Sequence, residues 1–242
     1  MEEKQTEKEE VKEEGTAWKP KTDLGKRVKA GEITDIEEVV GRGMRILEPE
    51  ITESLMPDME VDIFRSGQSK GKFGGGKSSI WKQTQKKTKE GNKPKFSAIV
   101  VVGNRHGYVG IGKGKAKETV PAREKATRRA KLDIIKVKRG SGSWESNINE
   151  PHSIPFRVEG KCGSVRVKLM PAPKGTGLRV EGECAKMLEL AGIKDIYSKT
   201  RGKTGTKINL IYACFDALKK LTEMKVGEEE KIKDDKHKNS NS

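Results

Sequence analysis

The stretch FSAIVVVGNRHGYVGIGKGKAKETVPAREKATRRAKL, residues 96–132, is the most informative about the fold because its apolar pattern changes period once. The apolar run within FSAIVVVGN is typical of a buried strand, and the turn Asn104 to Gly107 leads into a second strand, YVGIG. Beyond Gly114, alanines recur every four residues at 122, 126 and 130, which predicts an amphipathic helix with Pro121 in its first turn. The stretch therefore predicts strand, turn, strand and helix.

The flanking sequence extends this unit in both directions. IWKQTQKKT (80–88) predicts a strand, EGNKPK (90–95) a basic hairpin tip, and IIKVKRG (134–140) a closing strand. GIGKGK (110–115) is interpreted as a loop from strand to helix whose lysines face phosphate. It lacks the third glycine and the acidic partner of a dinucleotide-binding fingerprint.

A second unit is predicted further along the chain. SIPFRVEG (153–160) and SVRVKLM (164–170) alternate like paired strands across a turn at 161–163. PAPKGTG (171–177) is a loop, and ECAKMLELAG (183–192) is a short helix that ends at its glycine. IKDIYSKTRG (193–202) predicts a strand and a basic loop. An apolar stripe from 208 to 221 predicts a final helix of about 15 residues.

The fold class is therefore α/β (α+β), with two small domains, each with its own core, and extended tails. Within the N-terminal part, Thr34 and Glu37 match a capping box at the start of a helix. The expected divisions are a disordered acidic tail (1–15), a helical N-terminal extension (16–60), a basic Gly-rich linker or insertion (61–78), the first domain (79–140), a linker (141–153), the second domain (154–222) and a polar tail (223–242).

The charge is concentrated in the middle of the chain. The whole sequence of 242 residues has a net charge of +15. Residues 61–221 alone hold 36 basic and 13 acidic side chains, a net charge of +23. A folded region this basic repels itself unless it meets a polyanion, and each lysine or arginine docked on a phosphate releases counterions. The sequence therefore predicts a nucleic-acid-binding protein.

Several other classes of protein are disfavoured. The three cysteines are widely spaced, which suggests reduced thiols in the cytoplasm, and the three histidines are scattered, so we expect no metal site. No apolar run approaches a membrane span, and the acidic start is not a signal peptide. No catalytic constellation is recognisable, so we expect no enzyme and no cofactor.

One segment does match a nucleotide-binding motif. GKFGGGKS (71–78) fits the phosphate-binding pattern G-x-x-x-x-G-K-[ST]. That chemistry also needs an apolar strand running directly into the loop and a helix with an apolar stripe after it, and both are missing here. We therefore interpret the match as chance in a Gly- and Lys-rich segment.

A long, ordered set of motifs carries a family resemblance. VVVGN, GYVGIGKGKAKE, GKCGSVRVKLMPAPKGTG and ELAGIKDIYSKTRG follow one another between residues 100 and 202. In this order they resemble the small-subunit ribosomal protein five family, with a double-stranded-RNA-binding-like first domain. The prefix KPKTDLGKRVKAGEITDIEE is similar to the archaeal and eukaryotic form.

The resemblance implies a non-enzymatic constituent of the small (30S) ribosomal subunit. It implies a left-handed βαβ crossover in the second domain, 16S-type ribosomal RNA as the ligand, and contact with the fourth small-subunit protein. It also implies a place near messenger RNA at the entry site and a share in decoding accuracy. The Gly-rich segment 65–79 departs from the family pattern as an apparent insertion.

Two sets of site residues are expected. The protein-interface residues are Gly175, Gly177 and Lys186. The RNA-binding residues are the basic side chains of the hairpin, the loops, the first-domain helix and the strand ends: Lys86, Lys87, Lys93, Lys95, Arg105, Lys113, Lys115, Lys117, Arg123, Arg128, Arg129, Lys136, Lys138, Arg139, Arg166, Lys174, Lys199, Arg201 and Lys203.

Two other functions compete with a ribosomal role. An RNA-dependent NTPase or helicase accessory would use the loop 71–78, and it would bind nucleotide in isolation. A free double-stranded-RNA-binding regulator would differ only in failing to co-sediment with 30S particles.

Overall fold

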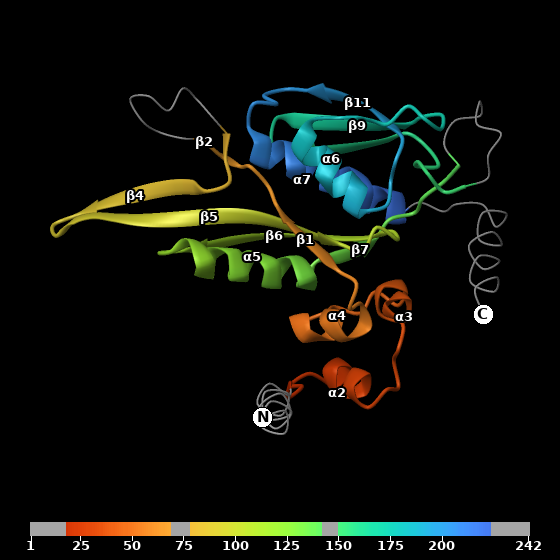
Figure 1. The fold of residues 1–242 in the computed structure, drawn as a ribbon, viewed down its shortest axis with the longest axis horizontal. Coiled ribbons are helices and arrows are strands. Elements are labelled where there is room, and N and C mark those ends of the chain that lie inside the picture. The colour runs from red at the N-terminus through yellow and green to blue at the C-terminus, as the bar shows by residue number, and fades with distance from the viewer. Residues whose placement is uncertain (1–17, 69–77, 142–149, 224–242) are drawn as a thin grey trace, which may run out of the picture. The chain divides into compact units, whose positions relative to one another are not determined.

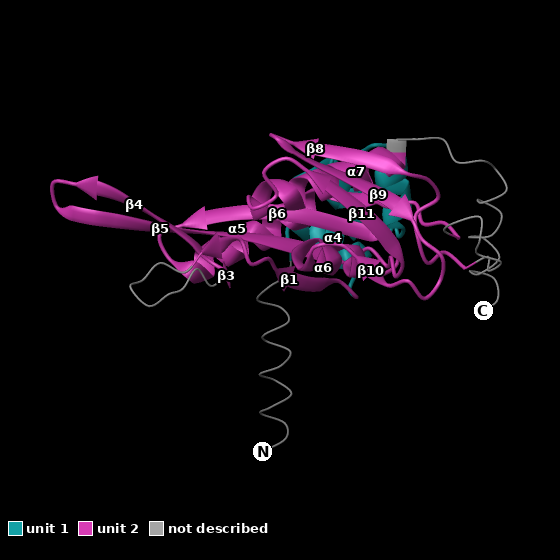
Figure 2. Cartoon of the chain, turned by 90° about the horizontal axis from the view of Figure 1, so that it is seen from above, with its two compact units in different colours: residues 1–57 teal, residues 58–242 magenta. Residues whose placement is uncertain are grey.

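The computed structural model describes residues 18–68, 78–141 and 150–223. The chain divides into two compact units, residues 1–57 and 58–242 (Figure 2). The expected acidic tail, nearly all of the motif 71–78, most of the expected linker 141–153 and the polar C-terminal tail lie outside the described residues.

The first unit contains three short helices, as expected of an N-terminal extension. They are α2 (Asp23–Lys29), α3 (Ile36–Gly41) and α4 (Pro49–Leu55). The expected capping box is wrong. Because α3 begins at Ile36, its N-cap is Asp35, which makes no side-chain capping bond, and Glu37 is the second helical residue instead of the third.

The second unit begins with an antiparallel sheet that contains the strand–turn–strand expected from residues 96–116. Its order is β1 (Glu60–Ile63), β5 (Gly91–Gly103), β6 (Tyr108–Ala116) and β7 (Ile134–Lys136), and β4 (Lys82–Thr88) also pairs with β5. β1 lies where a linker was expected, because Ile63 packs against the apolar residues of β5 and Phe64 is fully buried. Beside it, β2 (Gly67–Gln68) pairs with β3 (Ser78–Ser79).

The hairpin tip differs from the expected position. The turn lies at Lys89 and Glu90, and the segment expected to form the tip continues as strand: Lys93 pairs with Lys86 and Pro94 with Gln85. Proline fits here because β6 pairs with β5 only from Phe96 onward, so one side of this part of β5 needs no N–H donor.

The expected helix is α5 (Thr119–Leu132), and its buried residues are the three alanines at 122, 126 and 130. The interpretation of GIGKGK as a loop is wrong, because these residues are part of β6. A Cβ added at Gly110, Gly112 or Gly114 would lie 2.0–2.2 Å from a carbonyl oxygen of Ala130, Ala126 or Ala122 respectively. The glycines therefore let the helix backbone approach the strand closely.

The second sheet has the order β10–β11–β9–β8. Its strands are β8 (Val158–Cys162), β9 (Val165–Pro171), β10 (Leu178–Arg179) and β11 (Ile196–Arg201), and its helices are α6 (Gly182–Leu190) and α7 (Lys207–Glu223). Apart from the short β10, for which no strand was expected, these elements match the order expected for the second domain. β10, α6 and β11 form a parallel βαβ unit, whose hand stays a prediction.

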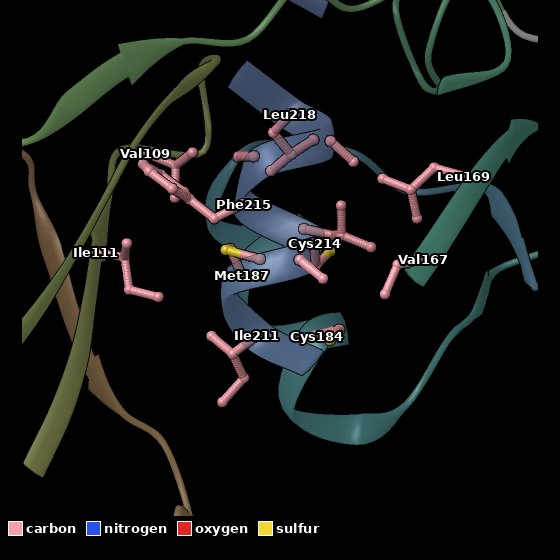
Figure 3. Packing of buried hydrophobic residues seen from close by; sticks show 14 of the residues in the cluster. Val109, Ile111, Val167, Leu169, Cys184, Met187, Ile211, Cys214, Phe215 and Leu218 are labelled. Carbon is pink, nitrogen blue, oxygen red and sulfur yellow. The ribbon is translucent and has the colours of Figure 1, made fainter. Parts of the chain in front are cut away.

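The two sheets share one apolar core, which differs from the expected pair of separate cores. Helices α6 and α7 lie between the sheets, and α5 covers the other face of the first sheet (Figure 1). Val109 and Ile111 of β6 lie on one side of α7, and Val167 and Leu169 of β9 lie on the other (Figure 3). Because α7 is apolar on both sides, it joins the two expected domains into one unit.

Candidate nucleic-acid interface

One face of the first sheet carries lysines beyond the end of the core. Successive side chains of a strand alternate between faces, so Lys113 and Lys115 continue the face of Val109 and Ile111 after the apolar residues end. The pairing register places β4 and β5 lysines on this same face. We define the lysine face as Lys82, Lys86, Lys93, Lys95, Lys113 and Lys115, and all six side chains are exposed.

The lysine face has little internal neutralisation. Lys86 lies directly opposite Lys93, and like charges in that position are destabilising in a sheet. The carboxylate nearest to this pair in sequence is Glu90, whose Oε2 lies 2.9 Å from Nζ of Lys93. Both partners of that ion pair are well exposed, so it contributes little. The arrangement therefore suits a ligand with several negative charges.

The structure brings together five of the predicted RNA-binding residues on this face and adds Lys82. The period-two spacing of Lys82, Thr84 and Lys86 in the sequence could have identified it. Lys87 belongs to the opposite face of the same hairpin, across from Asn92. Lys117 follows the end of β6 and is exposed.

Helix α5 contributes arginines on the side of the sheet opposite to the lysine face. Arg123, Arg128 and Arg129 are exposed between the buried alanines. Nη1 of Arg129 donates a 2.8 Å hydrogen bond to the carbonyl of Lys113, so this side chain is anchored to β6.

Two of the predicted RNA-binding residues form ion pairs with carboxylates of the same chain. Arg105, in the turn between β5 and β6, places Nη2 2.8 Å from Oε2 of Glu60 on β1. Lys174 lies 2.7 Å from Glu150, and its hydrogen bond and charge lower the pKa of that carboxyl. Arg105 and Lys174 therefore each have a carboxylate of the same chain as a neighbour, in ion pairs that are exposed like that of Lys93 and Glu90.

The remaining predicted basic residues are spread over other parts of the unit. Lys136 ends β7, Lys138 and Arg139 follow it half-buried, and Nη2 of Arg139 donates to the carbonyl of His106. Arg166 lies on β9 and Lys199 and Arg201 on β11, all exposed, and Lys203 follows in the next loop.

The predicted protein-interface residues do not form one cluster of contacts. Gly175 and Gly177 have φ values of +90° and +72°, and an added Cβ would meet no atom within 4 Å at either. Lys186, in contrast, is on α6, where its Nζ lies 3.2 Å from Oδ2 of Asp62 on β1. The glycines thus belong to an open loop, and the lysine holds two elements of the same chain together.

A buried polar cluster, which no sequence pattern predicted, holds the ends of this loop. His152 and Asp195 are nearly fully buried, with Nδ1 of the histidine 2.9 Å from Oδ2 of the carboxylate. Oδ1 of Asp195 accepts from the backbone N–H of Gly177, and the hydroxyl of Ser153 accepts from that of Ala172. His152 and Ser153 had been expected at the end of the linker 141–153, and Ser153 also at the start of the strand 153–160. Instead they anchor both ends of the loop 171–177.

The described part of the chain shows no other recognisable chemical site. No three metal-ligating side chains lie together within residues 18–68, 78–141 and 150–223. The helices of these ranges include none that is long and apolar enough to cross a membrane. A hydrogen bond with Cys184, together with burial, raises the pKa of Cys214, whose thiol therefore stays protonated at neutral pH.

Comparison with known proteins gives matches over both sheets of the second unit. Residues 81–138 match the family model described as ribosomal protein S5, N-terminal domain, and residues 160–231 match ribosomal protein S5, C-terminal domain. Small ribosomal subunit protein uS5 of Nanoarchaeum equitans is 50% identical over 209 residues, 86% of this chain and 90% of that protein. The uS5 proteins of Methanocaldococcus jannaschii (48% identical, covering 89% and 93%) and Pyrobaculum calidifontis (46%, covering 84% and 93%) are similar over comparable lengths.

Proposed function

Because this chain belongs to the ribosomal protein S5 family, in its archaeal form, we propose that it binds 16S-type ribosomal RNA through the lysine face as a structural constituent of the small ribosomal subunit in the cytoplasm. Membership makes it a ribosomal protein and not an enzyme. The observation that carries the RNA contact is the set of six exposed lysines on three neighbouring strands, including one directly opposed pair.

Phosphate neutralisation supplies most of the affinity in this proposal. The hairpin of β4 and β5 extends past the core, so its lysines can reach the backbone of a folded RNA while the rest of the sheet stays rigid. Contacts of this kind fix the register of the protein on RNA, and the shape of the RNA selects the site. Messenger RNA near the entry site is a further expected neighbour.

A double variant of the hairpin tests the proposal. Lys93→Gln with Lys95→Gln should weaken binding to small-subunit ribosomal RNA transcribed in vitro. It should also lower the slope of log K against log salt by about 1.8, since each lost phosphate contact contributes roughly 0.9 on duplex. The control, Lys194→Gln with Lys219→Gln, removes the same charge from exposed positions elsewhere. Weaker binding with an unchanged slope would show that these lysines do not contact phosphate.

The loop 171–177 is proposed to contact a neighbouring small-subunit protein, the fourth, and so to influence decoding accuracy. Its ends are anchored by the buried cluster of His152, Ser153 and Asp195, while Lys174 and Gly175 in its middle are exposed. An anchored loop with an open centre offers a fixed surface to a partner, because little conformational freedom is lost on binding.

Two substitutions at Gly177 separate partner contact from backbone conformation. The φ of +72° is accessible to asparagine but strained for larger residues, so Gly177→Asn should preserve both assembly and accuracy. Gly177→Arg should still assemble but change the misreading frequency, because it adds volume and charge to the contact. Normal misreading in ribosomes that contain the arginine variant would contradict the contact. Loss of assembly in both variants would indicate a purely conformational role.

A further inference from the structure

The outer face of the second sheet is a separate charged surface. Val158, Val165, Val167, Leu169 and Ile196 point toward α6 and α7 and are buried. The residues that alternate with them on β8, β9 and β11 therefore point away from the helices. Figure 2, seen from above, shows these three strands side by side.

Cations on this face are aligned in two rows that cross the three strands. One row is Arg201, Arg166 and Lys161, and the next is Lys199, Lys168 and Glu159. Neighbouring strands lie about 4.8 Å apart and alternate residues about 6.8 Å apart along a strand. Five cations and one carboxylate, a net charge of +4, are thus held within a patch roughly 10 Å wide.

This patch has no neutralising partner within residues 18–68, 78–141 and 150–223. None of its five cations forms an ion pair there, although Lys168 lies opposite Glu159. Arg166 of β9 lies directly opposite Arg201 of β11 and Lys168 directly opposite Lys199, so both of these cross-strand pairs oppose like charges. A bound polyanion would reduce the repulsion between these opposed cations.

The third row on this face is aromatic and apolar. Tyr197 is 41% exposed and lies opposite the half-buried Met170, one row beyond Lys199 and Lys168. An exposed aromatic ring on a flat sheet beside cations is the arrangement on which proteins stack unpaired bases. A duplex keeps its bases inside the helix, so it would leave this ring without a partner.

We propose that the outer face of β8, β9 and β11 binds a single-stranded segment of RNA. The phosphates lie along the two cationic rows, and one base stacks on Tyr197. The inference rests on the proposed function in taking RNA as the ligand, but the surface is distinct from the lysine face. No residue of the lysine face belongs to these strands.

A uridine 12-mer containing 5-iodouridine is the test ligand for the full chain. Irradiation should cross-link it to Tyr197, as located by mass spectrometry. Arg166→Gln with Arg201→Gln should lower the slope of log K against log salt by about 1.4, since each single-strand phosphate contact contributes roughly 0.7. Tyr197→Leu should weaken binding roughly tenfold and leave that slope unchanged.

The controls separate this inference from the proposed function. Lys93→Gln with Lys95→Gln should bind the 12-mer with the parent's cross-link at Tyr197. A parent that binds ribosomal RNA but not the 12-mer, or face variants that bind it as the parent does, would overturn the inference and leave the lysine face standing. Failure to bind either RNA would overturn both. Face variants that bind the 12-mer normally but no longer enter the small subunit would assign this face to an acidic protein instead.

Discussion

Glu48 is the residue on which the first unit depends most visibly. Its Oε1 accepts hydrogen bonds from the backbone N–H groups of Lys21 and Thr22, and its Oε2 accepts from the indole of Trp18, all between 2.7 and 2.8 Å. Desolvation raises its pKa, but the hydrogen bonds together lower the pKa by a larger amount. The pKa therefore lies below the ordinary 4.5. One carboxylate thus ties the entry into α2 to the start of α4.

The first prediction concerns acid stability of this unit. A carboxyl whose pKa is lowered by folding stabilises the folded state fully above its ordinary pKa, and that contribution is lost as pH falls through the lowered value. Trp18 fluorescence in the parent should therefore report loosening only below pH 4.5. In the Glu48→Gln variant, the first unit should be less stable at neutral pH, and its stability should depend less on acid pH.

A Trp18→Phe background identifies which part of the emission belongs to this tryptophan, since the chain has three. An acid transition that is identical in the parent and in Glu48→Gln would show that another group controls it. No sequence pattern predicted this site, because the carboxylate and its partners are 26–30 residues apart and their approach depends on the tertiary fold.

At the level of elements, the contact between β6 and α5 depends on the absence of side chains. The glycines at 110, 112 and 114 face the alanines at 122, 126 and 130, so two backbones approach where side chains would ordinarily separate them. Gly160 of β8 likewise allows a close approach to α7, because an added Cβ would lie 2.0 Å from the carbonyl oxygen of Ala213.

The second prediction is that Gly112→Ala destabilises the second unit by about 1–3 kcal/mol or more, because its Cβ would lie 2.1 Å from the carbonyl oxygen of Ala126. Gly182→Ala is the matched control: it adds the same methyl group at the start of α6, where nothing lies within 4 Å. Chemical denaturation of both variants gives the comparison. Equal stabilities would mean that the strand and helix separate without cost.

The elements themselves were largely predictable, and their contacts were less so. The period of four in the alanines and the period of two in β8 and β9 gave a helix and strands that the structure confirms. The glycines of GIGKGK were assigned to a loop because glycine is common there. Their true role depends on a helix that packs against them, which local sequence does not reveal.

At the scale of the whole molecule, α7 packs against both sheets of the second unit and so joins them in one core. Residues 79–140 and 154–222 read as separate domains because a Ser- and Asn-rich stretch divides them. In the structure, Phe215 extends from α7 toward Val109 of β6, while Cys214 faces the side of Val167 (Figure 3). Sequence periodicity shows that a helix is apolar, but it does not show that two different sheets cover it.

The last prediction is that both sheets of the second unit lose stability together when α7 is damaged. Phe215 is 7% exposed within the shared core, so Phe215→Ala should cost about 3–5 kcal/mol through lost burial and a cavity. The backbone amides of Val101 on β5 and Val167 on β9 should then lose protection from hydrogen exchange by a similar factor. Both strands pack on the cluster that contains the cavity. The control Val120→Ala, at a position on α5 that is 62% exposed, should leave the exchange protection of both amides unchanged. Faster exchange at Val167 with unchanged exchange at Val101 would mean that the sheets open independently, and that the two domains expected from the sequence are the true folding units.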